Sequence, residues 1–345
     1  MRCFFFRFLL SPTRLGLALL LAALGASSVV RAGDTTVIRL GTLLPSGTAQ
    51  YQSLQALAEE WQKLSNGSLK LTLYPDGRLG GESEMVKKMR IKQLNSCVLT
   101  AAGLAEIDQG IAALQVIPLS FRTWDEVDFV REKMRPQLEQ RLRAKGFEVL
   151  FWADAGWVRF FSKQPGTRPA DYKQMKLFTL AGDIRQAEIM KSIGYRPVAL
   201  ETSDILLGLN TDMINCVPVP PLIALAGQFS GPAPHMLELN WSPIVGAAII
   251  RRDTWDKLAP ELQAKLRAAS EAAGEKFRTQ SRAEHEKSVQ VLRERGVQVH
   301  QPTHPEEWQE LTDVLLTKVR GTLVPEDIFD EVQRLLAEYR RSHQP

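Results

Sequence analysis

Residues 64–86 read LSNGSLKLTLYPDGRLGGESEMV, and this stretch decides the fold class. Asn66-Gly67 is typical of the end of a helix, because both residues tolerate the left-handed backbone that terminates one. Leu69–Tyr74 alternates apolar and polar residues and predicts a strand. The Pro/Gly-rich residues 75–81 predict a turn, and Glu82 begins a second helix.

The same alternation continues on both sides of this stretch. Residues 37–43 predict a first strand, and residues 51–64 carry apolar residues at helical spacing. Residues 97–100 predict a further short strand. Strands that alternate with helices indicate the α/β class.

The first residues predict a secretory signal peptide over 1–32, cleaved after Ala32. Arg2, Arg7 and Arg14 precede or flank the apolar run Leu15–Leu24. This run is shorter than the roughly 20 residues that a membrane-spanning helix needs, so a retained anchor is disfavoured. We expect a periplasmic protein with no stable membrane insertion after signal cleavage.

Charge excludes one large class of partners. The chain holds 43 Lys and Arg against 39 Asp and Glu, and four of the arginines lie in residues 1–32. The remainder is therefore neutral and has no basic run, so no nucleic-acid partner is expected. Cys97 and Cys216 are too few for a disulfide-stapled scaffold.

Several segments together resemble one family, the DctP-type substrate-binding proteins of TRAP transporters. They are IRLGTLLP from Ile38, the stretch 64–86, GFEVLFWADAGWVRFFS from Gly146, and a long charged helix after Pro260. The likeness covers nearly the whole chain after residue 32, in the same order. YPDGRLGGESE is its most specific part.

The resemblance implies a two-lobed periplasmic binding protein fold (type II-like), with strands that cross between the lobes. It implies a small-molecule ligand in the interlobe cleft and delivery to the small and large TRAP membrane subunits. The expected domains are lobe I over 33–153 with part of 243–259, lobe II over 154–242, a long bracing helix over 260–297, and a C-terminal helical segment over 298–345.

The family's usual carboxylate-binding arginine lies on a strand written K-I-R-V, and here the matching residues are Lys176-Leu177-Phe178-Thr179. Phe178 cannot pair with a carboxylate, whereas an arginine grips one through two hydrogen bonds. Arg159 partly matches a second family pattern, G-x-R, and either binds the ligand or holds the interlobe strand. Arg185 either replaces the lost charge or faces solvent.

A second departure lies in INCVPVPPL, residues 214–222, where the family has V-D-G-x-E-N-P. Proline lacks a backbone donor, so a strand must stop here or lie at an edge. We interpret Pro218, Val219 and Pro220 as an apolar cleft wall. The alternative is that the segment only packs within its own lobe.

The other ligand-binding candidates rest on position. Trp152 and Trp241 lie near the expected crossovers and belong to the cleft or to the core. Ser46 follows the first strand, where loop amides can meet a polar ligand group. Glu82 is either a cleft acid or an early-helix acid favoured by the helix dipole.

These residues predict a receptor for a small, largely apolar or uncharged solute. The alternatives are an organic acid held by Arg159 or Arg185, and a periplasmic ligand sensor or interaction protein. An enzyme is not expected, because no nucleophile elbow, Walker loop or H-E-x-x-H motif is present. No cofactor is expected, and the five histidines lack metal-ligand spacing.

Overall fold

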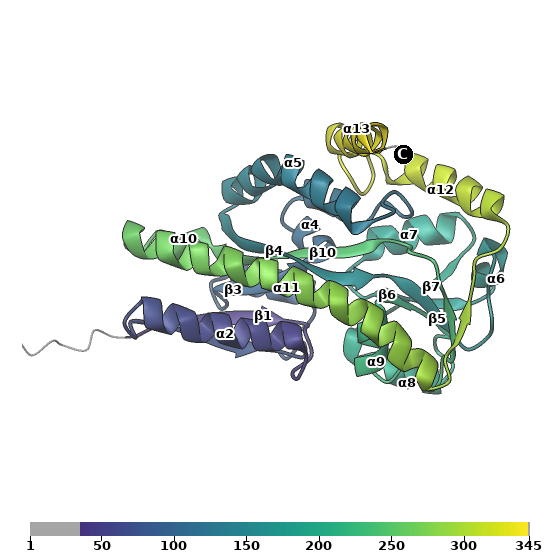
Figure 1. The fold of residues 1–345 in the computed structure, drawn as a ribbon, viewed down its shortest axis with the longest axis horizontal. Helices are drawn as coiled ribbons and strands as arrows, with labels where there is room; N and C mark the ends of the chain where they lie inside the picture. Colours follow the sequence, from purple (N-terminus) through teal and green to yellow (C-terminus); the bar gives the residue numbers. More distant parts are fainter. Residues whose placement is uncertain (1–34, 344–345) are drawn as a thin grey trace, which may run out of the picture. The chain divides into compact units, whose positions relative to one another are not determined.

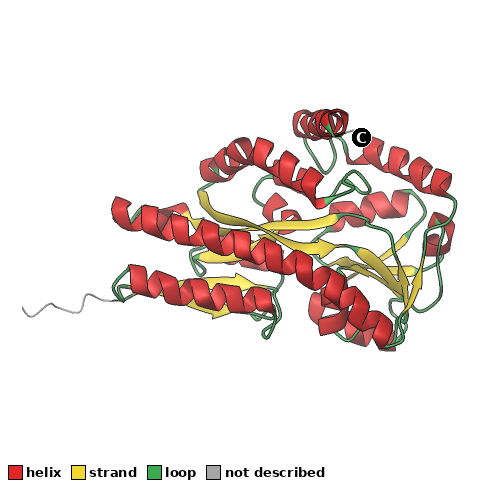
Figure 2. Ribbon diagram, in the orientation of Figure 1, coloured by secondary structure: helices red, strands yellow, loops and turns green. Residues whose placement is uncertain are grey.

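The computed structural model describes residues 35–343, which form two mixed β-sheets covered by helices (Figures 1 and 2). This architecture confirms the predicted two-lobed α/β class, with one sheet at the centre of each lobe. The signal peptide predicted over residues 1–32 lies outside the described residues.

The first sheet has the strand order β2-β1-β3-β10-β4. Strand β1 pairs in parallel with β2 and β3, whereas β10 is antiparallel to β3 and β4. Its strands are β1 (Thr36–Thr42), β2 (Leu69–Tyr74), β3 (Ser96–Thr100), β4 (Phe147–Trp157) and β10 (Pro243–Arg251). The helices of this lobe are α2 (Ala49–Leu64), α3 (Glu82–Arg90), α4 (Ala101–Ala105), η2 (Gln109–Leu114), α5 (Trp124–Ala144) and α10 (Arg252–Trp255).

The second sheet has the strand order β11-β9-β5-β8-β6-β7. Its strands are β5 (Arg159–Ser162), β6 (Lys176–Leu180), β7 (Arg196–Leu200), β8 (Cys216–Val219), β9 (His235–Leu237) and β11 (Gln298–His300). The helices of this lobe are α6 (Pro169–Lys173), α7 (Ile184–Ser192), η3 (Thr202–Asp204), α8 (Ile205–Asn210) and α9 (Pro221–Ala226).

Two adjacent chain segments connect the lobes. Strand β4 runs past the predicted boundary at residue 153 to Trp157, and β5 begins at Arg159. The chain returns through Trp241 and Ser242 to β10. The two crossings hydrogen-bond to each other, since Val158 N–H donates to the Ser242 carbonyl at 2.9 Å and Trp241 N–H to the Val158 carbonyl at 3.1 Å.

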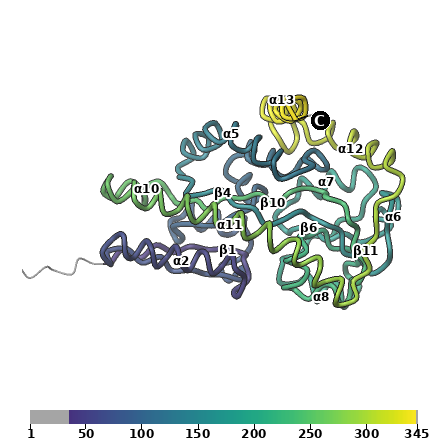
Figure 3. The backbone as a smooth tube through the Cα atoms, viewed as in Figure 1, coloured from purple at the N-terminus to yellow at the C-terminus, as the bar shows by residue number. Residues whose placement is uncertain are grey.

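Helix α11 (Pro260–Glu294) packs against both lobes, which the tube in Figure 3 follows along its length. In the first lobe, Trp61 Nε1 donates to Ser270 Oγ at 3.2 Å. In the second lobe, Val289 and Leu292 share a buried cluster with Phe161. Its apolar stripe is narrow, as expected of a helix whose other faces are solvated.

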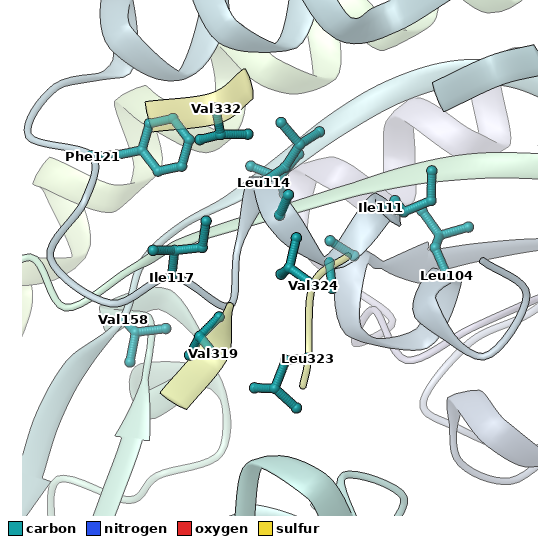
Figure 4. Packing of buried hydrophobic residues seen from close by; sticks show 14 of the residues in the cluster. Leu104, Ile111, Leu114, Ile117, Phe121, Val158, Val319, Leu323, Val324 and Val332 are labelled. Carbon is teal, nitrogen blue, oxygen red and sulfur yellow. The ribbon is translucent and has the colours of Figure 1, made fainter. Parts of the chain in front are cut away.

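The C-terminal helices form a second link between the lobes. Helix α12 (Pro305–Val319) packs on α6 and α7, whereas α13 (Glu326–Ser342) packs on α5 and η2. Figure 4 shows where these two helices pack against the segment between η2 and α5. Val319 and Val332 lie there with Ile117 and Phe121 in one buried cluster.

Candidate functional site

A cavity of about 310 Å³ lies between the two sheets. Its size falls at the lower end of the range for small-molecule sites. The first lobe contributes the end of β1, β3, and the middle of β4 and β10, and the second contributes β6, β8 and the start of α7 and α9. Both lobes therefore supply walls.

Several residues singled out from the sequence line this cavity: Phe178, Pro218, Val219, Pro220, Trp241 and Glu82. Phe160, whose side chain meets the Trp241 ring edge-on at 5.2 Å, lines it as well. The structure places these residues predicted from the sequence at this cavity, and their contact with a ligand stays a prediction.

The proline run forms one apolar side of the cavity. Strand β8 stops at Val219, as the prolines predict, and Pro220 and Pro221 start α9. Pro218 lies within β8, which is an interior strand of the second sheet. The ladder of β8 with β6 contains only the pair Leu177–Cys216. A missing donor at Pro218 therefore breaks no bond to β6.

Arg159 does not line the cavity. Phe160 lines the cavity, whereas the side chain of the neighbouring Arg159 points to the opposite face of β5 and is not part of the lining. Its Nη1 is 3.3 Å from Glu238 Oε1, and Glu238 also pairs with Arg293 at 3.1 Å. These ion pairs connect the start of β5 to Glu238 and to α11, and a ligand-binding role for Arg159 stays a prediction.

Part of the Arg159 guanidinium is nevertheless unsatisfied. Its Nε and Nη1 are buried without a well-aligned hydrogen bond, and both ring nitrogens of buried His285 on α11 also lack partners. Burial, followed by the Arg159 charge, lowers the pKa of His285 to about 4. His285 is therefore neutral at physiological pH.

The remaining sequence candidates lie outside the cavity walls. Trp152 is buried against α5 and donates from Nε1 to Glu139 at 3.0 Å. Ser46 is exposed, and its backbone N–H donates to Asp76 Oδ1 at 2.7 Å. Arg185 lies at an adjacent, more polar hollow and, with the Gln109 amide oxygen turned toward it, donates from Nη2 to that oxygen at 3.0 Å.

The charged groups of the cavity wall are all acidic. Among the described residues that line it, Glu82, Asp154 and Asp183 carry carboxyl groups, and none is Lys, Arg or His. Burial raises the pKa of all three, and that of Asp183 reaches about 6. Asp154 and Asp183 were missed in the sequence. From the sequence, Asp183 at the Asp-Ile-Arg start of α7 could be recognised only as a helix N-cap residue.

Another missed residue is Gln115, which follows η2. Its Oε1 is buried without a hydrogen-bond partner, and the residue lines the cavity. No local motif marks it. Among the described residues, no group of three His, Cys, Asp or Glu is placed to hold a metal ion, and both cysteines are free and buried.

This fold, with two sheets and an apolar cavity between the lobes, is typical of two-lobed binding proteins. The family model for DctP, described as bacterial extracellular solute-binding protein, family 7, matches residues 40–321. The chain belongs to this family and is a DctP-type TRAP substrate-binding protein, not an enzyme. Within residues 35–343, no helix is long and apolar enough to cross a membrane.

Two curated relatives and one solved structure illustrate the likeness. The C4-dicarboxylate-binding periplasmic protein DctP of Rhodobacter capsulatus is 24% identical over 310 residues, which cover 88% of this chain and 90% of the relative. The 2,3-diketo-L-gulonate-binding periplasmic protein YiaO of Escherichia coli K12 is 25% identical over 82% of this chain and 86% of its own. A TRAP periplasmic solute-binding protein from Xanthobacter autotrophicus, with bound β-D-galacturonate, superimposes with a TM-score of 0.80 at 17% identity, over 87% of this chain and 99% of that one.

Proposed function

We propose that this protein is a periplasmic TRAP receptor for a small, largely apolar or uncharged solute, which it delivers to the small and large membrane subunits. The observation that carries the proposal is the composition of the cavity wall. By the resemblance, Phe178 stands where the family's carboxylate-binding arginine is expected, and no basic side chain lines the cavity among the described residues. Apolar wall area contributes roughly 25 cal/mol per Å² that a ligand covers.

A second candidate is an organic acid, which the names of the relatives favour. Relatives are named for binding a C4-dicarboxylate or 2,3-diketo-L-gulonate, and one solved structure holds galacturonate. An acid would need a cation, and the candidates that the sequence offers are Arg159 and Arg185. Arg159 would have to give up its pairing with Glu238, and Arg185 its contact with Gln109.

Native mass spectrometry of the protein purified without denaturation, followed by solvent extraction of what it carries, tests the proposal. We expect a co-purifying molecule that is largely apolar or uncharged and carries no carboxylate. A small carboxylate among the extracted compounds would overturn this ligand class and support the second candidate.

Arg159→Ala separates the two candidates further. It should abolish binding of an acid held by Arg159 but only weaken binding of an apolar solute. Arg293→Ala is the matched control, because Arg293 pairs with the same Glu238 but is exposed and is no candidate for holding the ligand. A loss of binding common to both variants would indicate a structural effect through Glu238.

A further inference from the structure

The polar groups of the cavity wall differ in how fully they are already bonded. Asp154 has a fully buried side chain, and its two oxygens lie 3.3 Å from Arg131 Nη1 and 2.6 Å from Arg282 Nη2. Glu82 accepts from the Thr100 N–H and the Thr100 hydroxyl, each at 2.6 Å. Both carboxylates are therefore engaged within the protein and have little capacity left for a ligand.

Asp183 is different. It precedes α7 as its N-cap residue, and its side chain makes no capping hydrogen bond by strict geometry. No Lys or Arg lies within ion-pair distance of it in the described part of the chain, and the nearby Glu106 carboxylate adds repulsion. Only the Gln186 backbone N–H stabilises its charge. This acid lines the cavity with unused acceptor capacity.

A second acceptor faces the cavity from the other lobe. Gln115 Oε1 is buried without any donor, which is unfavourable for a polar atom removed from water. The two residues belong to different lobes and line the same cavity, so a ligand bound there lies between them. Each acceptor can take a hydrogen bond from a donor on that ligand, whereas a carboxylate has no hydrogen to donate to either.

We propose that Asp183 determines specificity and that the solute carries a hydrogen-bond-donating cationic group, such as a primary ammonium, on an apolar body. The inference rests on the proposed function, because it places the ammonium at one end of the same apolar cavity. A charge-assisted N–H···O bond is about twice as strong as a neutral one, so an ammonium is favoured over a hydroxyl.

Three probes with one apolar body test this inference by isothermal titration calorimetry: 3-phenylpropylamine, 3-phenylpropan-1-ol and 3-phenylpropanoate. The amine should bind about tenfold more tightly than the alcohol, and the carboxylate most weakly. Asp183→Asn should remove the advantage of the amine over the alcohol. Asn is also a good N-cap residue, so α7 should remain folded.

Glu188→Gln is the matched control, because Glu188 is an exposed acid on the same helix and does not line the cavity. It removes one negative charge and should leave the order of the three probes unchanged. Gln115→Met tests the other acceptor and should weaken the amine and the alcohol alike, with thermal unfolding verifying that the variant is folded.

The outcomes separate this inference from the proposed function. If the alcohol binds as tightly as the amine and Asp183→Asn changes nothing, the ammonium inference is wrong and the apolar receptor stands. If the carboxylate binds most tightly, or if none of the probes binds at millimolar concentration, both are overturned.

Discussion

Arg282 of α11 holds Asp154 of β4 through two hydrogen bonds to one oxygen, from Nε at 2.8 Å and Nη2 at 2.6 Å. The same guanidinium also binds Asp128 of α5 through Nη1 and Nη2, both at 2.7 Å. One side chain thus joins the long helix, the crossover strand and α5. These ion pairs lie next to the cavity, because Asp154 is one of the residues that line the cavity.

Replacing Arg282 by Met should destabilise the protein by about 2–4 kcal/mol, because the buried carboxylate of Asp154 loses its closer partner. Chemical unfolding in urea measures the change. Adding Asp154→Asn should recover part of the loss, since no uncompensated charge then remains. Arg334→Met, which removes exposed pairs with Glu331 and Glu338, should cost less than about 1 kcal/mol and serves as the control. An equal loss in the two Arg variants would contradict this account.

Gly274→Ala sets helix propensity against packing. An alanine is favoured by about 1 kcal/mol in a helix interior. However, its Cβ would lie 2.5 Å from Phe151 Cβ, at the close approach of α11 to β4. Overpacking of this kind costs about 1–3 kcal/mol, so we expect net destabilisation in urea unfolding.

Thr279→Ala, at an exposed position of the same helix, is the control for Gly274→Ala. It should be neutral or slightly stabilising, because alanine has the higher helix propensity and the hydrogen bond lost, from the Thr279 hydroxyl to the Glu275 carbonyl, is exposed. A stabilised Gly274→Ala variant would show that α11 can move away from the sheet without loss.

His285 should make stability depend on pH. Its pKa falls from 6.5 to about 4 on folding, so below pH 6.5 the unfolded chain binds a proton that the folded protein does not. Stability is therefore fully present above pH 6.5 and is lost as pH falls toward 4, by at most about 3 kcal/mol. Urea unfolding of His285→Gln from pH 7.5 to 4.5 should show a shallower decline than the wild type.

The control for this pH effect is His343→Gln, at an exposed position near the C-terminus. It should keep the wild-type dependence over the same range. If His285→Gln declines as steeply as the wild type, another group is responsible for the loss of stability.

Phe178→Arg should restore a carboxylate preference. It places a guanidinium on β6 at the cavity, where the resemblance puts the family's carboxylate-binding arginine. We expect 3-phenylpropanoate to bind at least about tenfold more tightly than to the wild type, by calorimetry, because a guanidinium can bind it bidentately. Phe178→Leu, which keeps the wall apolar, should show no such gain. If the two variants bind the carboxylate equally, position 178 does not control this choice.

Much of the fold could be predicted from short stretches. The second strand was predicted at Leu69–Tyr74, which is where β2 lies, and the helix from Glu82 is α3. These segments carry their own turn and periodicity signals. The end of the long helix was predicted at residue 297 and lies at Glu294, since Gly296 and Val297 leave the helix before β11.

The sequence by itself determined the α/β alternation and the family likeness, because both depend on short runs of adjacent residues. Only the tertiary structure decided that Arg159 lies on the face of β5 turned away from the cavity and pairs with Glu238. Strand periodicity separates two faces but does not say which one meets the other lobe. Asp183 and Gln115 are far apart in the chain, and no local pattern could indicate that folding brings both to one cavity.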